Sequence, residues 1–164
     1  YIKSKSSLEI IDLKDRNDRK GNGKIRLSKI HFKNGQGETA PYFACGEEAQ
    51  FWLEYEMDEK TKEDLIFYLS IDSAIDRTRI ATISNKYSGQ KIYSDKNIIK
   101  ISINRLPLNA GDYYITLFVE GAGGVYDWIQ KAAIFSVKYA DYYGKNGQLP
   151  PQSLGIVLLD YKIS

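Results

Sequence analysis

The sequence predicts an all-β protein, one antiparallel β-sandwich domain of about eight strands, and three observations support this fold class. Apolar and polar side chains alternate along several short segments, which is the period of a half-buried strand. Turn-forming residues separate these segments, with no strong helical pattern between them. Aromatic residues make up 13% of the chain and thirteen of them are Tyr, a residue that favours strands. A chain of 164 residues can bury a sufficient core without disulfide bonds.

Residues 1–20 are predicted to be a linker from an upstream domain. The stretch 12–20 is densely charged, and the few apolar residues before it allow at most one short helix. The sequence Gly-Asn-Gly at 21–23 then interrupts the chain, and the apolar period changes to two. We therefore expect the β-sandwich domain to span residues 21–164.

The first four strands are expected at residues 24–33, 47–57, 65–72 and 79–84. In the first of them the apolar phase changes near Ser28 and Lys29, which predicts a bulge. The next two alternate cleanly, and their inward side chains are expected to be Ala49, Phe51, Leu53, Tyr55 and Met57, then Leu65, Phe67, Leu69 and Ile71.

The last four strands are expected at residues 97–104, 112–120, 132–138 and 154–162, with a polar loop over 86–96. A proline-containing loop over 144–152 leads into the last strand. The sequence Leu-Pro-Leu-Asn-Ala-Gly-Asp before Tyr113 is typical of a tyrosine corner, in which the hydroxyl bonds back to the preceding turn. Tyr113 is therefore predicted to be structural.

Charge and reactive residues exclude several classes of function. Residues 1–24 carry seven of the 23 Lys and Arg, which leaves 16 basic and 17 acidic residues beyond them and no basic stripe for nucleic acid. One histidine, His31, and one cysteine, Cys45, cannot build a recognisable zinc site or catalytic triad. Neighbouring carboxylates such as Glu47 and Glu48 are typical of solvated turns. We expect no catalytic residue, metal or cofactor.

Six short segments occur in an order that resembles a known family. They lie at residues 21–27, 46–48, 108–114, 132–137, 141–144 and 158–161. Together they resemble the C-terminal carbohydrate-binding domain of the Wzt family, the ATPase subunit of ABC transporters that export bacterial O-antigen polysaccharide. The likeness extends over about residues 12–164.

The resemblance implies an immunoglobulin-like sandwich at the cytoplasmic side of the inner membrane that binds the O-antigen glycan before export. It also implies a homodimer, with a last strand that can be exchanged between protomers. Further implied partners are an upstream ATPase domain and a transmembrane permease subunit. The sequence contains no Gly-x-x-x-x-Gly-Lys-Ser/Thr phosphate loop, so we do not expect this chain to hydrolyse ATP.

Alternation also predicts where a glycan binds, since sugars need aromatic faces beside polar groups. The outward side chains are expected to be Tyr68, Ser70 and Asp72 on one strand and Tyr114, Thr116 and Phe118 on another. In an immunoglobulin-like sandwich these two strands are neighbours, with 132–138 beside them. Trp128 would join this face from its rim.

Other surfaces and other functions are left open by the sequence. Trp52, outward on the opposite sheet beside Glu54 and Glu56, is the second candidate for the site, and the loop with Tyr87 and Tyr93 is the third. The first face is covered, and not a glycan site, if residues 139–152 or a second protomer pack on it. With a second protomer there, the face is a protein interface. The domain would then be structural. A glycan-cleaving enzyme is the third hypothesis.

Overall fold

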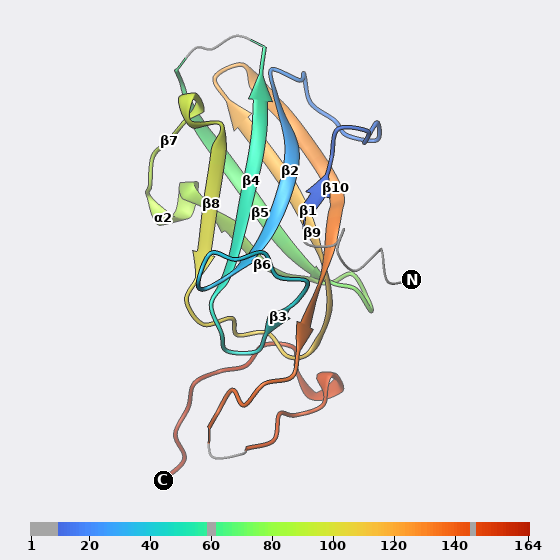
Figure 1. The fold of residues 1–164 in the computed structure, drawn as a ribbon, viewed down its shortest axis with the longest axis vertical. Helices are drawn as coiled ribbons and strands as arrows, with labels where there is room; N and C mark the ends of the chain where they lie inside the picture. The colour runs from blue at the N-terminus through green and yellow to red at the C-terminus, as the bar shows by residue number, and fades with distance from the viewer. Residues whose placement is uncertain (1–9, 59–61, 145–146) are drawn as a thin grey trace.

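Two facing sheets build the molecule, as the predicted sandwich requires (Figure 1). The computed structural model describes residues 10–58, 62–144 and 147–164. The four-stranded sheet has the order β1 (Ile10–Asp12), β2 (Ile25–Asn34), β4 (Ala49–Met57), β8 (Ile98–Ile103). The six-stranded sheet comprises β3 (Phe43–Ala44), β10 (Gly124–Lys138), β9 (Gly111–Gly121), β5 (Asp64–Ser73) and β6 (Arg79–Ser84), with β7 (Ile92–Tyr93) also paired to β5.

The core lies between the sheets and is made of the side chains that alternation assigned to it. All the predicted inward residues of β4 and β5 are buried except Met57, which is partly buried. The predicted bulge in β2 is confirmed, because its pairing with β4 shifts between Leu27 and Lys29. At the β3 end of the core a cluster of rings packs edge to face, and it consists of Phe32, Phe43, Phe51 and Phe135.

The predicted tyrosine corner is confirmed at the start of β9. The hydroxyl of Tyr113 donates a hydrogen bond of 2.6 Å to the backbone carbonyl of Asn109, and the ring is fully buried. Burial disfavours the charged phenolate and raises the pKa of Tyr113 to about 12. Tyr113 therefore holds the turn before β9.

The strand predicted at 132–138 is longer than expected. It begins at Gly124, directly after a hairpin turn that follows Gly121, and runs for 15 residues as β10. Its pairing with β9 shifts between Ile129 and Ala133, and Lys131 has a φ of 48°. This irregularity breaks the two-residue alternation, so the sequence pattern located only the second half of β10. Trp128 accordingly lies within the sheet rather than at its rim.

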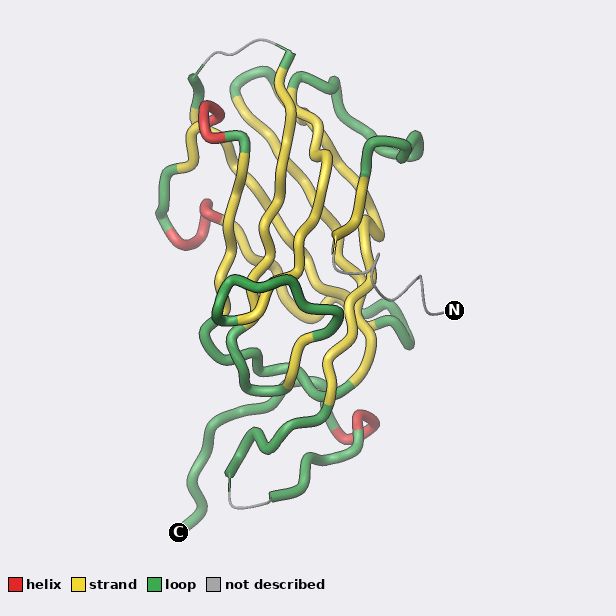
Figure 2. The backbone as a smooth tube through the Cα atoms, viewed as in Figure 1, coloured by secondary structure: helices red, strands yellow, loops and turns green. Residues whose placement is uncertain are grey.

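The strand predicted at 154–162 is wrong. The short 3-10 helix η2 (Gln152–Leu154) ends where the strand was expected to begin. Within 154–162 there is a single bridge, between Val157 and Leu108. Figure 2 shows the segment as a loop that runs below the sandwich to the C-terminus. Leu158 alone is buried there, and its amide bonds to the carbonyl of Pro107 at 2.7 Å. Alternation was present, but an alternating segment forms a strand only beside a free sheet edge.

Residues 10–20, which we expected to be linker, pack against the sandwich. β1 pairs with β2 in antiparallel register, and Leu13 is buried in the core. The remainder of the predicted linker, residues 1–9, lies outside the described residues. The sandwich therefore includes the chain from Ile10 onward rather than from residue 21.

The polar loop predicted over 86–96 contains short regular elements. They are the helical turns α2 (Asn85–Ser88) and η1 (Ser94–Lys96), with β7 between them.

Candidate binding site

The strand register brings the predicted site residues of β5 and β9 together on the outer face of the six-stranded sheet. Tyr68 pairs with Phe118, Ser70 with Thr116, and Asp72 with Tyr114. Side chains of directly paired residues project from the same side of a sheet. β10 then places Trp128 opposite Phe118 on that same side.

Four aromatic side chains form a continuous row across this face, which we call the aromatic row: Trp128, Phe118, Tyr68 and Tyr87. Their ring centroids are 5.8, 5.4 and 6.4 Å apart in that order, each pair edge to face. Tyr87 comes from α2 and is 71% exposed, so the loop that was our third candidate contributes to the first. Edge-to-face packing holds each ring against its neighbours.

A shallow hollow of about 310 Å³ lies along the aromatic row. It is lined by Tyr68, Ser70, Arg79, Thr82, Thr116, Phe118, Glu120 and Trp128. Five of these were predicted from the sequence, and three were missed. Glu120 continues the outward positions of Tyr114, Thr116 and Phe118 but was not named as a site residue. Pairing the predicted strand 79–84 with β5 would have added Arg79 and Thr82.

Polar side chains in and beside the hollow bond mainly to one another. The Tyr68 hydroxyl donates to Glu120 Oε2 at 3.3 Å, and Ser70 and Thr82 share a hydrogen bond of 3.2 Å. Arg79 Nε donates to Asp72 Oδ1 at 2.8 Å, and this bond raises the pKa of Arg79. Each of these oxygens has further lone pairs for a ligand hydroxyl.

Four predicted residues differ in detail from the expectation. Ser70 and Thr116 project outward but are buried, so they form the floor of the hollow. Tyr114 lies beside the hollow rather than in it, with the Lys131 ammonium 5.3 Å from its ring centroid. Asp72 pairs with Tyr114 across the sheet and reaches the hollow through its bond to Arg79.

Trp52, the second candidate, lies on the outer face of the four-stranded sheet. Two ammonium groups lie within cation–π distance of its ring, from Lys33 at 4.5 Å and Lys100 at 4.1 Å. Its indole nitrogen donates to Gln50 Oε1 at 3.0 Å. The ring is therefore already in contact with polar groups of the protein itself.

The described part of residues 139–152 does not cover the aromatic row. This segment packs at the β3 end of the sandwich, where the Tyr142 hydroxyl donates to the carbonyl of Leu158 and Asn109 Nδ2 donates to that of Pro150. Figure 1 shows it below the two sheets. One of the two covers that the sequence left open is thus excluded for the described residues.

The N-terminal segment fixes the strand that carries Trp128. Backbone hydrogen bonds of 2.9 and 2.8 Å join Lys20 and Trp128 in both directions, and the Lys20 ammonium is 5.3 Å from the indole centroid. One residue earlier on each strand, Arg19 and Asp127 form a buried ion pair at 2.9 Å. Burial raises the pKa of Asp127 and lowers that of Arg19, so each charge needs the other.

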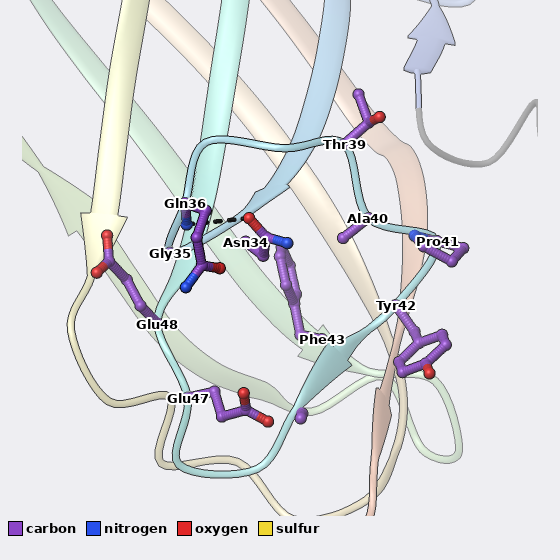
Figure 3. A pocket seen from close by; sticks show the side chains of 11 residues that line it. Asn34, Gly35, Gln36, Thr39, Ala40, Pro41, Tyr42, Phe43, Glu47 and Glu48 are labelled. Atoms are coloured by element: carbon purple, nitrogen blue, oxygen red, sulfur yellow. Dashed lines mark hydrogen bonds between the residues drawn. The ribbon is translucent and has the colours of Figure 1, made fainter.

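A larger hollow of about 580 Å³ lies at the β3 end, between the loop after β2 and the loop before β4 (Figure 3). Its polar lining includes Asn34, Gln36, Glu47 and Glu48, and its exposed aromatic side chain is Tyr42. Asn34 Oδ1 accepts hydrogen bonds from the backbone of its own loop. The sequence analysis missed Tyr42, because it lies in a loop without periodicity.

The single histidine and the single cysteine, the side chains most suited to metal or nucleophilic chemistry, lie in different parts of the fold. Within 10–58, 62–144 and 147–164, no three His, Cys, Asp or Glu side chains are grouped to hold a metal ion. His31 bonds to Glu54 on the four-stranded sheet, and Cys45 is buried. Among the helices formed by these residues, none is long and apolar enough to cross a bilayer.

Comparison with known proteins decides the family. A family model described as the Wzt C-terminal domain matches residues 16–149. The chain belongs to this family. A crystal structure of the C-terminal domain of Wzt superposes with a TM-score of 0.68 at 13% identity, covering 92% of this chain and 89% of that one. Membership supports a non-catalytic, carbohydrate-binding role in an ABC transporter, and the superposition confirms the fold.

Other solved structures resemble the chain less. The soluble domain of PmoD from Methylocystis sp. ATCC 49242 (Rockwell) has a TM-score of 0.38 at 12% identity, covering 71% of this chain and 98% of that one. A chitin binding domain from Burkholderia pseudomallei has a TM-score of 0.34 at 13% identity, covering 60% and 57%. No curated protein sequence matches the chain.

Proposed function

We propose that this Wzt C-terminal domain binds O-antigen polysaccharide at the aromatic row and thereby selects the glycan for export by its ABC transporter. The observation that carries the proposal is the aromatic row beside the polar hollow, on an outer sheet face that would ordinarily be polar. Partly exposed rings next to hydroxyl, carboxylate and guanidinium groups suit a ligand that is apolar on its C–H faces and polar at its edges.

The shape of the site fits a polymer rather than a small molecule. The hollow is shallow and lies on an open sheet face between β6 and β10, so a glycan can cross it without its ends being enclosed. Few groups are buried on binding such a surface, and we expect a single-site affinity of about −4 to −6 kcal/mol. Two sites in one transporter would raise the affinity through avidity.

The partners in this proposal follow from the family. The domain would act at the cytoplasmic side of the inner membrane, joined to an upstream ATPase domain and working with a transmembrane permease subunit. Residues 10–20 support such a connection, since backbone hydrogen bonds and an ion pair attach this N-terminal part of the domain to β10, the strand of Trp128. No nucleic acid is expected as a partner.

We also propose a homodimer that forms through the C-terminal segment. This segment is extended, and it exposes large apolar side chains that a monomer leaves in water: Leu154, Val157, Leu159, Tyr161 and Ile163. Replacing Leu159, Tyr161 and Ile163 with Ser should convert a dimer to a monomer in sedimentation velocity. A wild-type chain that sediments as a monomer at high concentration would contradict this.

The binding proposal is tested by calorimetric titration with O-polysaccharide released by mild acid from the lipopolysaccharide of the strain that encodes the protein. Tyr68→Ala and Phe118→Ala should each weaken binding roughly tenfold, because each removes a ring from the aromatic row. Trp52→Ala is the matched control and should bind like wild type. A wild-type protein without measurable binding would contradict the function, and a loss on Trp52→Ala alone would move the site.

The same variants decide the alternative, a structural domain whose aromatic row is a protein interface. A dimer that dissociates on Phe118→Ala, with no polysaccharide binding by wild type, would favour the interface. The C-terminal segment speaks against it, because five large apolar side chains are exposed there, whereas Tyr87 is the one member of the aromatic row that is strongly exposed.

A further inference from the structure

A second aromatic surface lies on the same side of the molecule as the aromatic row, at the opposite end of the sheet. Tyr42, just before β3, is 49% exposed and lines two hollows at once. One is the hollow of Figure 3, and the other, of about 170 Å³, lies between Tyr42 and the outer side chains of β10. In Figure 3, Pro41 and Tyr42 lie at the right, apart from Gln36 and Glu48 at the left. Residues 40–43 line both hollows, so this short segment with Tyr42 lies between them.

The second hollow continues the outer face that holds the aromatic row. It is lined by Asp112, Ile134 and Ser136, among others. Asp112 projects to the same side as Tyr114, Thr116 and Phe118, because all occupy alternate positions of β9. Ser136 pairs with Asp112 and Ile134 with Tyr114. The outer face thus leads along β9 from Phe118 down to Asp112, past Lys131 at the irregularity of β10.

The chemistry near Tyr42 repeats that of the aromatic row. Ile134 is 40% exposed and adds an apolar wall to a face that otherwise should be polar. Ser136 Oγ donates to Asp112 Oδ1 at 2.6 Å, so a carboxylate and a hydroxyl stand beside the ring, as Glu120 stands beside Tyr68. On the other side of Tyr42 the amides of Asn34 and Gln36 line the larger hollow.

We propose that Tyr42 is the centre of a second glycan subsite, which binds further residues of the same polysaccharide chain that crosses the aromatic row. The seven residues from Asp112 to Phe118 span about 20 Å of strand, a length that a single sugar cannot cover but a chain of several repeat units can. The inference rests on the proposed function. It makes the domain a reader of chain length as well as of sugar identity.

The test compares the O-polysaccharide with the single repeat unit isolated from it. For the polymer, Tyr42→Ala should weaken binding about fivefold or more, since one ring contact and the avidity it gives are lost. For the single repeat unit, the same variant should bind like wild type, because a short ligand occupies only the aromatic row. Tyr68→Ala should weaken both. Tyr139→Ala, an exposed tyrosine that lines neither hollow, is the control.

The outcomes separate this inference from the function on which it rests. Polymer binding that is lost on Tyr68→Ala but unchanged on Tyr42→Ala overturns the second subsite and leaves the proposed function standing. Equal losses for polymer and repeat unit on Tyr42→Ala overturn it too, since Tyr42 would then belong to a single site. A change in sedimentation on Tyr42→Ala would assign the surface to a second protomer instead. A wild-type protein that binds neither ligand contradicts both proposals.

Discussion

The outer faces of the two sheets carry similar residue types but present them differently. On the six-stranded sheet, the rings of Phe118 and Tyr68 contact other rings and border a hollow. On the four-stranded sheet, Trp52 lies between two lysine ammonium groups and donates its indole hydrogen to Gln50. Both faces satisfy the sequence criterion of an outward aromatic among polar neighbours. The hollow of the first face is lined by rings and polar groups together, whereas the hollow of about 560 Å³ beside Glu54 and Glu56 on the second face does not include Trp52.

The difference teaches that outward direction and availability are separate properties. Alternation along a strand decides the first, because successive side chains point to opposite faces. Availability depends on what neighbouring strands place beside the ring, and this follows from register. Lys100 lies directly opposite Trp52 on β8, whereas Trp128 lies opposite Phe118 on β10.

The largest expected effect concerns the ion pair beneath the face of the aromatic row. Asp127→Ala should lower the free energy of unfolding by about 3–5 kcal/mol, because it leaves the buried guanidinium of Arg19 without its carboxylate. The exposed pair of the other face, Lys14 with Glu56 at 3.8 Å, is the contrast. Glu56→Ala should change stability by less than about 0.5 kcal/mol. Urea denaturation measures both, and equal losses would contradict the comparison.

A smaller effect is expected from two of the buried tyrosines, Tyr113 in the six-stranded sheet and Tyr55 in the four-stranded sheet. Tyr113→Phe removes a hydrogen bond of 2.6 Å and should cost about 1–2 kcal/mol of unfolding free energy. Tyr55→Phe removes a bond of 3.4 Å to the carbonyl of Tyr93 and should cost less. Urea midpoints for the two variants, at neutral pH, give the ranking. A larger cost for Tyr55→Phe would contradict the role of the tyrosine corner.

The pH dependence of the Tyr113 effect follows from its pKa. The folded-state pKa of about 12 lies above the value of about 10 for an unfolded tyrosine. The neutral phenol therefore contributes its full stability below pH ~10, and this contribution is lost as the pH rises toward 12. The advantage of wild type over Tyr113→Phe should shrink across that window. An advantage that stays constant from pH 9 to 11.5 would show that the phenol is not the cause.

Much of the fold could be predicted because β4, β5 and β9 keep a strict alternation over their whole length. That alternation was enough to place Tyr68, Ser70, Thr116 and Phe118 outward on adjacent strands. The first half of β10 could not be predicted in the same way, since the irregularity before Ala133 changes the phase within the strand.

The rest of the site could not be predicted because it depends on contacts between distant segments. Tyr87 joins the aromatic row only because α2 folds back beside Tyr68. Tyr42 comes from a loop that carries no periodic pattern, so nothing in the sequence aims its ring at β10. The segment 154–162 shows the opposite error, since its alternation predicted a strand and the structure gives it a single bridge, from Val157 to Leu108.

The most direct test of the central claim uses the two tryptophans, one on each outer face, as reporters in a single titration with O-polysaccharide. With excitation at a wavelength that tyrosine does not absorb, Trp52→Phe leaves Trp128 as the only emitter, and Trp128→Phe leaves Trp52. We predict that the emission of the Trp52→Phe protein shifts to shorter wavelength as polysaccharide is added, because the glycan displaces water from the aromatic row. The emission of the Trp128→Phe protein should stay constant. A shift confined to the Trp128→Phe protein would place the glycan on the four-stranded sheet and contradict the account.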